Sequence, residues 1–117
     1  MIRAALIACT LAAPAFAHTA LTGWSYDHVC CHDRDCVAIP EDTVEATTEG
    51  WVVTLTHDDH PLVPEGETFP RLFRYYDGIV GNGHLEPKEA RMSGDFMFHA
   101  CVVGPRIICL YEQRRGF

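Results

Sequence analysis

Hydrophobic and polar positions alternate in two neighbouring segments near the middle of the chain, residues 43–47 and 51–56. Both segments are rich in β-branched residues, and the pair Glu49–Gly50 between them is a turn signal, so the sequence predicts a β-hairpin. Successive side chains of a strand point to opposite faces. One face of the second strand would therefore carry Trp51, Val53 and Leu55, and the other Val52, Thr54 and Thr56.

A second hairpin is predicted at the end of the chain, where the apolar segments 96–103 and 107–111 flank the turn pair Gly104–Pro105. Shorter strands are expected at 37–39 and within 69–76.

Helical structure is expected only at residues 86–91, as one or two turns with Pro87 at a tolerated early position. No apolar stripe of helical period is long enough to suggest more. The predicted fold class is mostly β: a small antiparallel sheet stapled by disulfides, with one short helical turn.

The first 17 residues have the pattern of a secretory signal peptide. Arg3 precedes an apolar run at 4–13, and the small residues Ala15 and Ala17 suit a signal peptidase. We therefore expect cleavage after Ala17, and a single exported domain, periplasmic or extracellular, at residues 18–117. Two other readings are an acylated Cys9 at the end of a lipobox and a buried N-terminal helix.

Composition narrows the class of protein further. The chain has 117 residues and a formal net charge of −7, which does not fit a helical membrane protein, a basic nucleic-acid binder or a disordered acidic tail. We expect no transmembrane anchor in the mature chain and no nucleic-acid partner. An acidic surface favours cationic partners, such as a basic protein or a component of the cell envelope.

Six cysteines are present, and Cys9 would leave with the leader. An oxidising compartment makes disulfides the default interpretation for the other five, and spacing does not choose among their pairings. A bridge between Cys101 and Cys109 would cross the terminal hairpin. A bridge from Cys30 or Cys31 to either of them would close a loop of about 70 residues, with a chain-entropy gain of about 4.4 kcal/mol against about 2.6 kcal/mol for the hairpin. We favour at least one long bridge. The candidates are Cys30, Cys31, Cys36, Cys101 and Cys109, one of which would stay unpaired, bind a metal or join another chain.

An aromatic pair, a cysteine cluster and two cysteine-bearing strands follow one another along the chain: Trp24-x-Tyr26, Cys30-Cys31-x4-Cys36 with Asp35 before the last cysteine, Phe98-His99-Ala100-Cys101 and Cys109-Leu110-Tyr111. This order resembles a group of small exported proteins of alphaproteobacteria and their phages. The resemblance covers both ends of the mature chain and implies export and disulfide bonds. It implies no particular activity.

Histidines provide the candidate chemistry. Segment 28–36 combines thiols, imidazoles and carboxylates that could bind zinc or copper, although a disulfide cluster with solvated histidines is favoured. If the mature chain begins at His18, its amine and imidazole could chelate copper together, with His99 as a third ligand. The metal candidates are His18, His28, His32 and His99.

The turn at 57–60 holds two more histidines, His57 and His60, around two aspartates. We expect a solvated tip whose acidic neighbours raise the pKa of both imidazoles.

No nucleophile motif or C-x-x-C redox motif is present, so catalysis is not indicated. The sequence favours a non-enzymatic, exported binding or interaction module stabilised by disulfides. The alternatives are a metal-binding protein using His18, and a thiol-redox protein using the odd cysteine.

Overall fold

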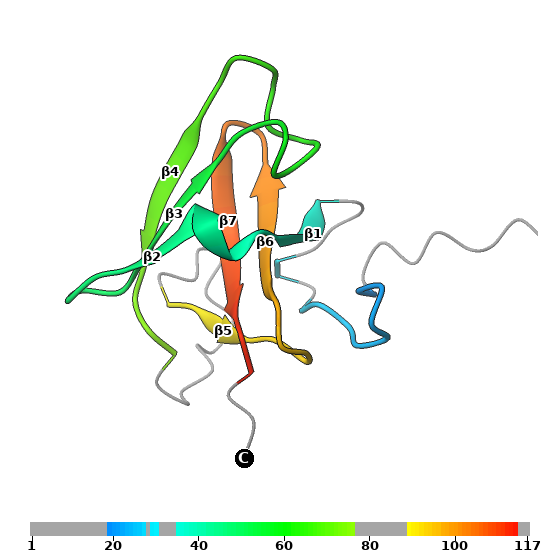
Figure 1. Ribbon diagram of the computed structural model, residues 1–117. Coiled ribbons are helices and arrows are strands. Elements are labelled where there is room, and N and C mark those ends of the chain that lie inside the picture. The colour runs from blue at the N-terminus through cyan, green and yellow to red at the C-terminus, as the bar shows by residue number, and fades with distance from the viewer. Residues whose placement is uncertain (1–18, 28, 31–34, 77–88, 115–117) are drawn as a thin grey trace, which may run out of the picture.

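The computed structural model describes residues 19–27, 29–30, 35–76 and 89–114, which form two β-sheets (Figure 1). The first sheet has four strands in the order β1 (Cys36–Ile39), β6 (Phe98–Val103), β7 (Arg106–Glu112) and β5 (Arg91–Met92). The second has three, in the order β2 (Val44–Ala46), β3 (Trp51–Leu55) and β4 (Phe69–Phe73). The expected mostly β fold is confirmed.

Both hairpins predicted from the alternation are present. Strands β2 and β3 pair antiparallel, with Val44 opposite Val53, and β4 extends this sheet on the other side of β3. Val53 and Leu55 are completely buried while Thr54 between them is exposed, as the alternation predicts.

The terminal hairpin, β6 with β7, contains an irregularity that decides which cysteines face each other. The turn is Gly104–Pro105, with Gly104 at a φ of +58°, and the register shifts between Cys101 and Val102. The register shift sets Cys101 opposite Cys109. Without it, the two-residue turn would place Ile108 opposite Cys101. The two do not bond to each other: each is joined to a cysteine in an earlier part of the chain.

The two disulfides are Cys30–Cys109 and Cys36–Cys101, with sequence separations of 79 and 65 residues. The first is a long bridge of the kind favoured by loop length. The second joins β1 to β6, where the two residues are register partners with Cα atoms 4.0 Å apart. The fifth candidate, Cys31, lies outside the described residues.

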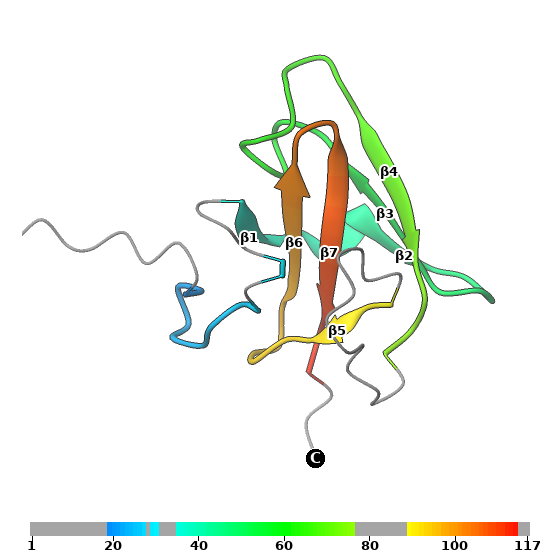
Figure 2. The same cartoon turned by 180° about the vertical axis from the view of Figure 1, so that it is seen from behind.

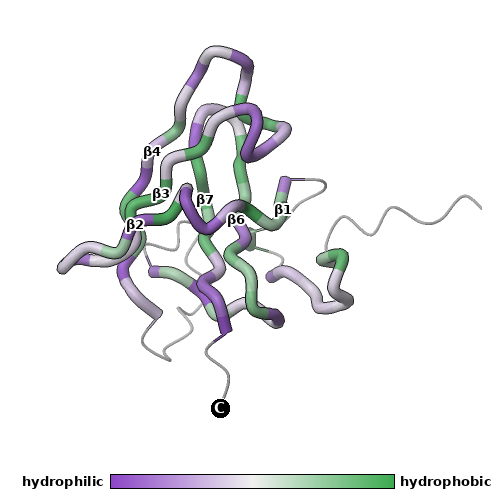
Figure 3. Tube along the Cα trace, in the orientation of Figure 1, coloured by the Kyte–Doolittle hydropathy of each residue, from purple (hydrophilic) through white to green (hydrophobic). Residues whose placement is uncertain are grey.

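Side chains alternate along β6, and each face of the four-stranded sheet carries a buried cluster. One face, which includes Phe98, Ala100 and Val102, packs in the main core with Val53, Leu55 and Phe73 of the second sheet. The opposite face, which we call the arm face, carries a second buried cluster that holds both disulfides with Tyr26 and Tyr111. The trace is hydrophobic along the centres of β6 and β7 and hydrophilic at the C-terminal end of β7 (Figure 3).

The helical turn predicted at residues 86–91 is absent from residues 89–91, the part of it that the structure describes. Residues 86–88 lie outside the described residues, but Glu89 forms a bridge with Arg74, and Arg91 begins β5, which runs parallel to β7. Edge pairing thus keeps the end of this segment extended. In the described ranges, the helical turn is instead a 3-10 turn at Glu41–Thr43, directly after Pro40. Across those same ranges, no helix has the length and apolar character needed to cross a membrane.

Candidate functional site

Residues 19–27, which we call the arm, lie beside β1 and β6 on the side of the molecule away from the second sheet (Figures 1 and 2). Trp24 is the anchor of the arm. Its ring meets Tyr26, His99 and Tyr111 edge-on, at centroid distances of 4.8, 4.9 and 5.2 Å. Gly94 allows this approach, since a Cβ there would lie 2.3 Å from Cγ of Trp24.

Asp95 holds the arm by hydrogen bonds. Its Oδ2 accepts from Thr22 Oγ1 at 2.5 Å and from Trp24 Nε1 at 3.0 Å, and its Oδ1 accepts from the Met97 N–H at 2.9 Å. Nε2 of His99 lies 2.9 Å from Oδ1. Burial alone would raise the pKa of this carboxyl group, but the donated hydrogen bonds outweigh burial and hold the pKa well below its usual range. Asp95 is therefore a carboxylate at neutral pH.

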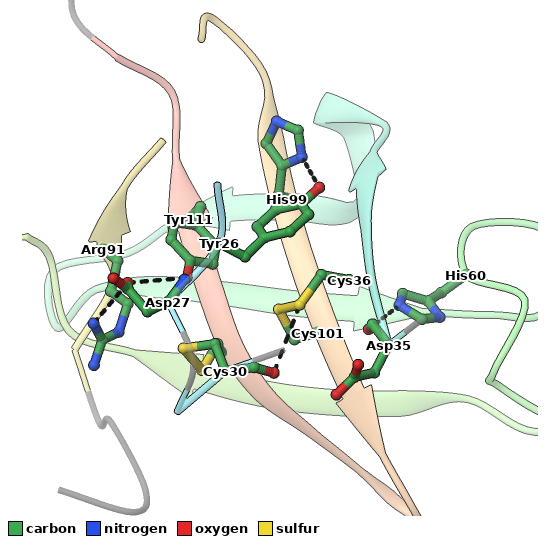
Figure 4. The surroundings of a disulfide bond; sticks show 11 residues. Tyr26, Asp27, Cys30, Asp35, Cys36, His60, Arg91, His99, Cys101 and Tyr111 are labelled. Atoms are coloured by element: carbon green, nitrogen blue, oxygen red, sulfur yellow. Dashed lines mark hydrogen bonds and ion pairs between the residues drawn. A yellow bond between two sulfur atoms is a disulfide. The ribbon is translucent and has the colours of Figure 1, made fainter. Parts of the chain in front are cut away.

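His99 connects Asp95 to Tyr26. The residue is 2% exposed, and its Nδ1 lies 2.8 Å from Oη of Tyr26 (Figure 4). Because a carboxylate only accepts, Nε2 carries the proton shared with Asp95, while Nδ1 shares a hydrogen bond with the Tyr26 hydroxyl group. Both nitrogens of His99 are thus engaged, and a metal ion would have to displace one of these partners.

A second polar cluster ties the arm to β5 and β7. The backbone N–H of Asp27 donates to Oη of Tyr111 at 2.8 Å, and Tyr111 donates back to the Asp27 carboxylate at 3.0 Å (Figure 4). Arg91 forms an ion pair with the same carboxylate at 2.8 Å. Burial, followed by the nearby Asp27 charge, raises the pKa of Tyr111, so this phenol stays protonated as a donor.

A pocket of about 340 Å³ lies between the arm, β1 and the start of β6. Its lining residues are neutral or apolar apart from His99: Thr19, Ala20, Leu21, Thr22, Tyr26, Cys36, Val37, Ala38, Met97 and His99. Two of them are prominent on its rim, because Leu21 is fully exposed and Met97 is 44% exposed. Neighbouring Phe96 is 69% exposed. The Asp95 network holds the arm that forms one wall, while the sheet forms the floor.

The expectation of a solvated histidine tip at 57–60 was wrong for His60. That side chain is completely buried, with Nε2 2.9 Å from the Asp35 carbonyl and Nδ1 accepting from the Leu62 N–H at 3.1 Å. Nε2 is accordingly the protonated nitrogen of a neutral ring. Burial lowers the pKa of His60 and outweighs the hydrogen bonds to carbonyl groups that would raise it.

The other predicted metal ligands, His18, His28 and His32, lie outside the described residues, so a copper or zinc site that includes them stays a prediction. Within the described ranges, no group of three or more His, Cys, Asp or Glu residues is placed to hold a metal ion.

The sequence gives no sign of the central role of Asp95, because Ser93, Gly94 and Asp95 in succession are typical of an ordinary turn. The signal available was the aromatic pair Trp24 and Tyr26, which indicates an anchor without showing what it meets. The partner of the anchor is more than 70 residues away along the chain.

Comparisons of this chain with the models of protein families, with curated proteins and with solved structures find no match.

Proposed function

We propose that this chain is an exported, disulfide-stabilised binding module without catalytic activity, and that its pocket accepts an apolar side chain of a partner protein. The observation that carries the proposal is the pocket itself, with a neutral lining and with Leu21 and Met97 exposed on its rim. Concave, mainly apolar sites with a few fixed polar groups are the usual form of a binding site.

The polar groups beside the pocket support binding more than catalysis. His99 uses both ring nitrogens, and the Asp95 carboxylate has five hydrogen-bond partners: Thr22, Trp24, Ser93, the Met97 N–H and His99. His99, which is 2% exposed and has both nitrogens bonded, holds the wall of the pocket in position and has little freedom to act on a substrate.

The binding test is a selection of random decapeptides displayed on phage against the mature protein. Ala38→Trp would fill the pocket, and we expect it to abolish enrichment of the peptides that bind the wild type. Leu21→Asp, on a fully exposed side chain that cannot unfold the domain by losing packing, should weaken the same peptides about tenfold. Leu72→Trp is the matched control, because it adds similar apolar surface at an exposed position of β4. Equal enrichment on Ala38→Trp and on the wild type would contradict the proposal.

Export is tested by the intact mass of protein recovered from a bacterial periplasm. We expect a chain that starts at His18 and is four hydrogens lighter than the reduced form, because two disulfides are closed. Material with five free thiols, or with the leader attached, would argue against an exported, disulfide-stabilised domain.

A further inference from the structure

The outer edge of β1 borders the pocket. In the described part of the chain, β1 is the terminal strand of its sheet and pairs only with β6. An unpaired strand edge presents a row of N–H and C=O groups that can accept a further strand.

The register shows which of these groups point outward. The Asp35 carbonyl accepts from the Val102 N–H at 2.8 Å, so these two residues form a hydrogen-bonded pair. Bonded and non-bonded pairs alternate in an antiparallel ladder, so Ala38 and His99 form a non-bonded pair. The N–H and C=O of Ala38 therefore point away from β6, and among the described residues neither has a hydrogen-bond partner.

The same register connects the strand edge to the pocket. Ala38 lies opposite His99 on the arm face, and both line the pocket. In an added antiparallel strand, the residue opposite Ala38 would exchange both backbone hydrogen bonds with it. Its side chain would point to the same face, and hence into the pocket.

Charge indicates the chemistry of the occupant. The pocket lining contains no Lys, Arg, Asp or Glu, but the exposed Glu41 and Asp42 follow β1 directly after Pro40. A second copy of this chain would bring another net charge of −7 to the same edge. A cationic segment is favoured over a second copy because like charges oppose the approach of two such surfaces.

We infer that the partner binds as an extended, cationic segment that adds antiparallel to the free edge of β1 and places one apolar side chain in the pocket opposite Ala38. This inference rests on the proposed function. Because the added strand runs opposite to β1, the residues two and three positions before the apolar one would lie opposite Pro40 and Glu41, and we expect its basic side chains there. The four residues of β1 limit the paired segment to a length of about 13 Å.

The probe is a synthetic peptide, acetyl-Lys-Lys-Thr-Leu-Thr-Thr-amide, with binding measured by calorimetry and by NMR shifts of the mature protein. N-methylation of the leucine amide removes the donor that would face the Ala38 carbonyl, and we expect it to weaken binding about tenfold or more. N-methylation of the following threonine, whose amide would point away from β1, is the matched control and should change affinity less than about threefold.

A second part of the test uses variants of the protein. Ala38→Pro removes only the outward N–H, since this residue makes no ladder bond to β6, and proline is tolerated on edge strands. It should weaken the peptide about tenfold, whereas Ala38→Ser, which keeps the N–H, should bind like the wild type. The methylated peptides test the same contact on the unaltered protein, so the inference stays falsifiable even if Ala38→Pro fails to fold.

Equal effects of the two methylations would overturn strand addition, as would no binding of the synthetic peptide at all. If phage-displayed peptides sensitive to Ala38→Trp were still found, the proposed function would survive that failure. A concentration-dependent dimer that Ala38→Pro abolishes, measured by sedimentation, would replace the cationic segment with a second copy.

Discussion

Asp95 stabilises the arm through charge, because one carboxylate accepts hydrogen bonds from Thr22, Trp24, His99 and the Met97 N–H. Bonds to a charged group in a buried setting contribute more than neutral ones, about 1.5–3 kcal/mol each against about 1. The side chain of Asp95 is 11% exposed, so water competes little for these donors.

Replacing Asp95 by Asn should therefore destabilise the protein by about 2–3 kcal/mol at pH 7. The NH2 group of the amide would point at N–H and O–H groups that now donate to a carboxylate oxygen, and it cannot accept their hydrogen bonds. The folded-state pKa of Asp95 lies below its unfolded value of 3.8. Its stabilisation is accordingly complete above pH 4–5 and is lost as the pH falls from about 3.8 through the folded-state pKa.

Urea unfolding of wild type and Asp95→Asn at pH 7, 3 and 2 checks this prediction, and the difference should narrow at the two acidic values. Asp58→Asn, in an exposed turn, is the control and should change stability by less than about 0.5 kcal/mol. A difference that stays constant from pH 7 to pH 2 would mean that the charge of Asp95 contributes nothing.

His60 differs from Asp95 in that its neutral form, and not its charged form, stabilises the folded protein, because the ring is buried. Its folded-state pKa is lower than the unfolded value of 6.5. Below pH 6.5 the unfolded chain takes up a proton that the folded protein refuses, so stability falls as the medium becomes more acidic. The contribution of this one group is at most about 1.4 kcal/mol per pH unit.

We expect His60→Gln, which keeps a donor for the Asp35 carbonyl, to have a flatter stability profile between pH 7.5 and 5 than the wild type. His57→Gln changes the exposed histidine of the same turn and is the matched control. Thermal unfolding across this range measures both variants. If His57→Gln flattens the profile instead, then His57, and not His60, is the histidine that causes the slope.

The residue scale also shows where sequence reasoning fails. The pattern 57–60 is strongly polar, and polar turns are exposed as a rule. Burial of His60 depends on the Asp35 carbonyl, which comes from a segment 25 residues earlier. A contact of that kind leaves no local trace in the sequence.

At the scale of elements, the sequence predicts those pairings that join segments close together along the chain. The hairpins β2–β3 and β6–β7 follow from alternation and turn residues within about ten positions. The pairing of β1 with β6, and the parallel pairing of β5 with β7, join segments that no local pattern connects. Half of the pocket depends on the first of these pairings, so the candidate site could not be located from the sequence.

The two disulfides should differ in local effect although their loops are similar in length. Loops closed by separations of 79 and 65 residues give chain-entropy gains of about 4 kcal/mol each, so removing either bridge should cost about 2–5 kcal/mol. Cys30–Cys109 connects the segment that follows the arm to β7. Cys36–Cys101 joins strands that also share ladder hydrogen bonds.

We therefore expect the double variant Cys30→Ala and Cys109→Ala to release the arm. Hydrogen exchange should accelerate at Ala20 and Gly23, whose amides are bonded within the arm, before global unfolding occurs. The double variant Cys36→Ala and Cys101→Ala is the matched comparison and should leave arm exchange close to the wild-type rate. Equal acceleration in the two variants would show that the arm is held by the sheet as a whole and not by its own bridge.

At the scale of the whole molecule, the central sheet separates two tasks. One face joins the three-stranded sheet in the main core, and the arm face holds the disulfides and the pocket. The domain is small, and its core is supplemented by two covalent links on the face that a second sheet does not cover. The pocket on this face therefore has one wall, the arm, that takes no part in the main core.

The net charge of −7 acts on the whole molecule and should control how fast a cationic partner arrives. For the lysine-containing peptide, we expect the association rate constant to fall about tenfold between 20 and 500 mM salt while the dissociation rate constant changes little. Removing two charges beside β1, in Glu41→Gln with Asp42→Asn, should reduce this salt dependence.

The control is Glu65→Gln with Glu67→Gln, in an exposed turn between β3 and β4, which changes the net charge equally. Stopped-flow fluorescence of a dye-labelled peptide measures both rates. If the two double variants slow association equally, overall charge alone attracts the partner, whereas a larger effect at Glu41 and Asp42 means that the field is concentrated at the edge of β1.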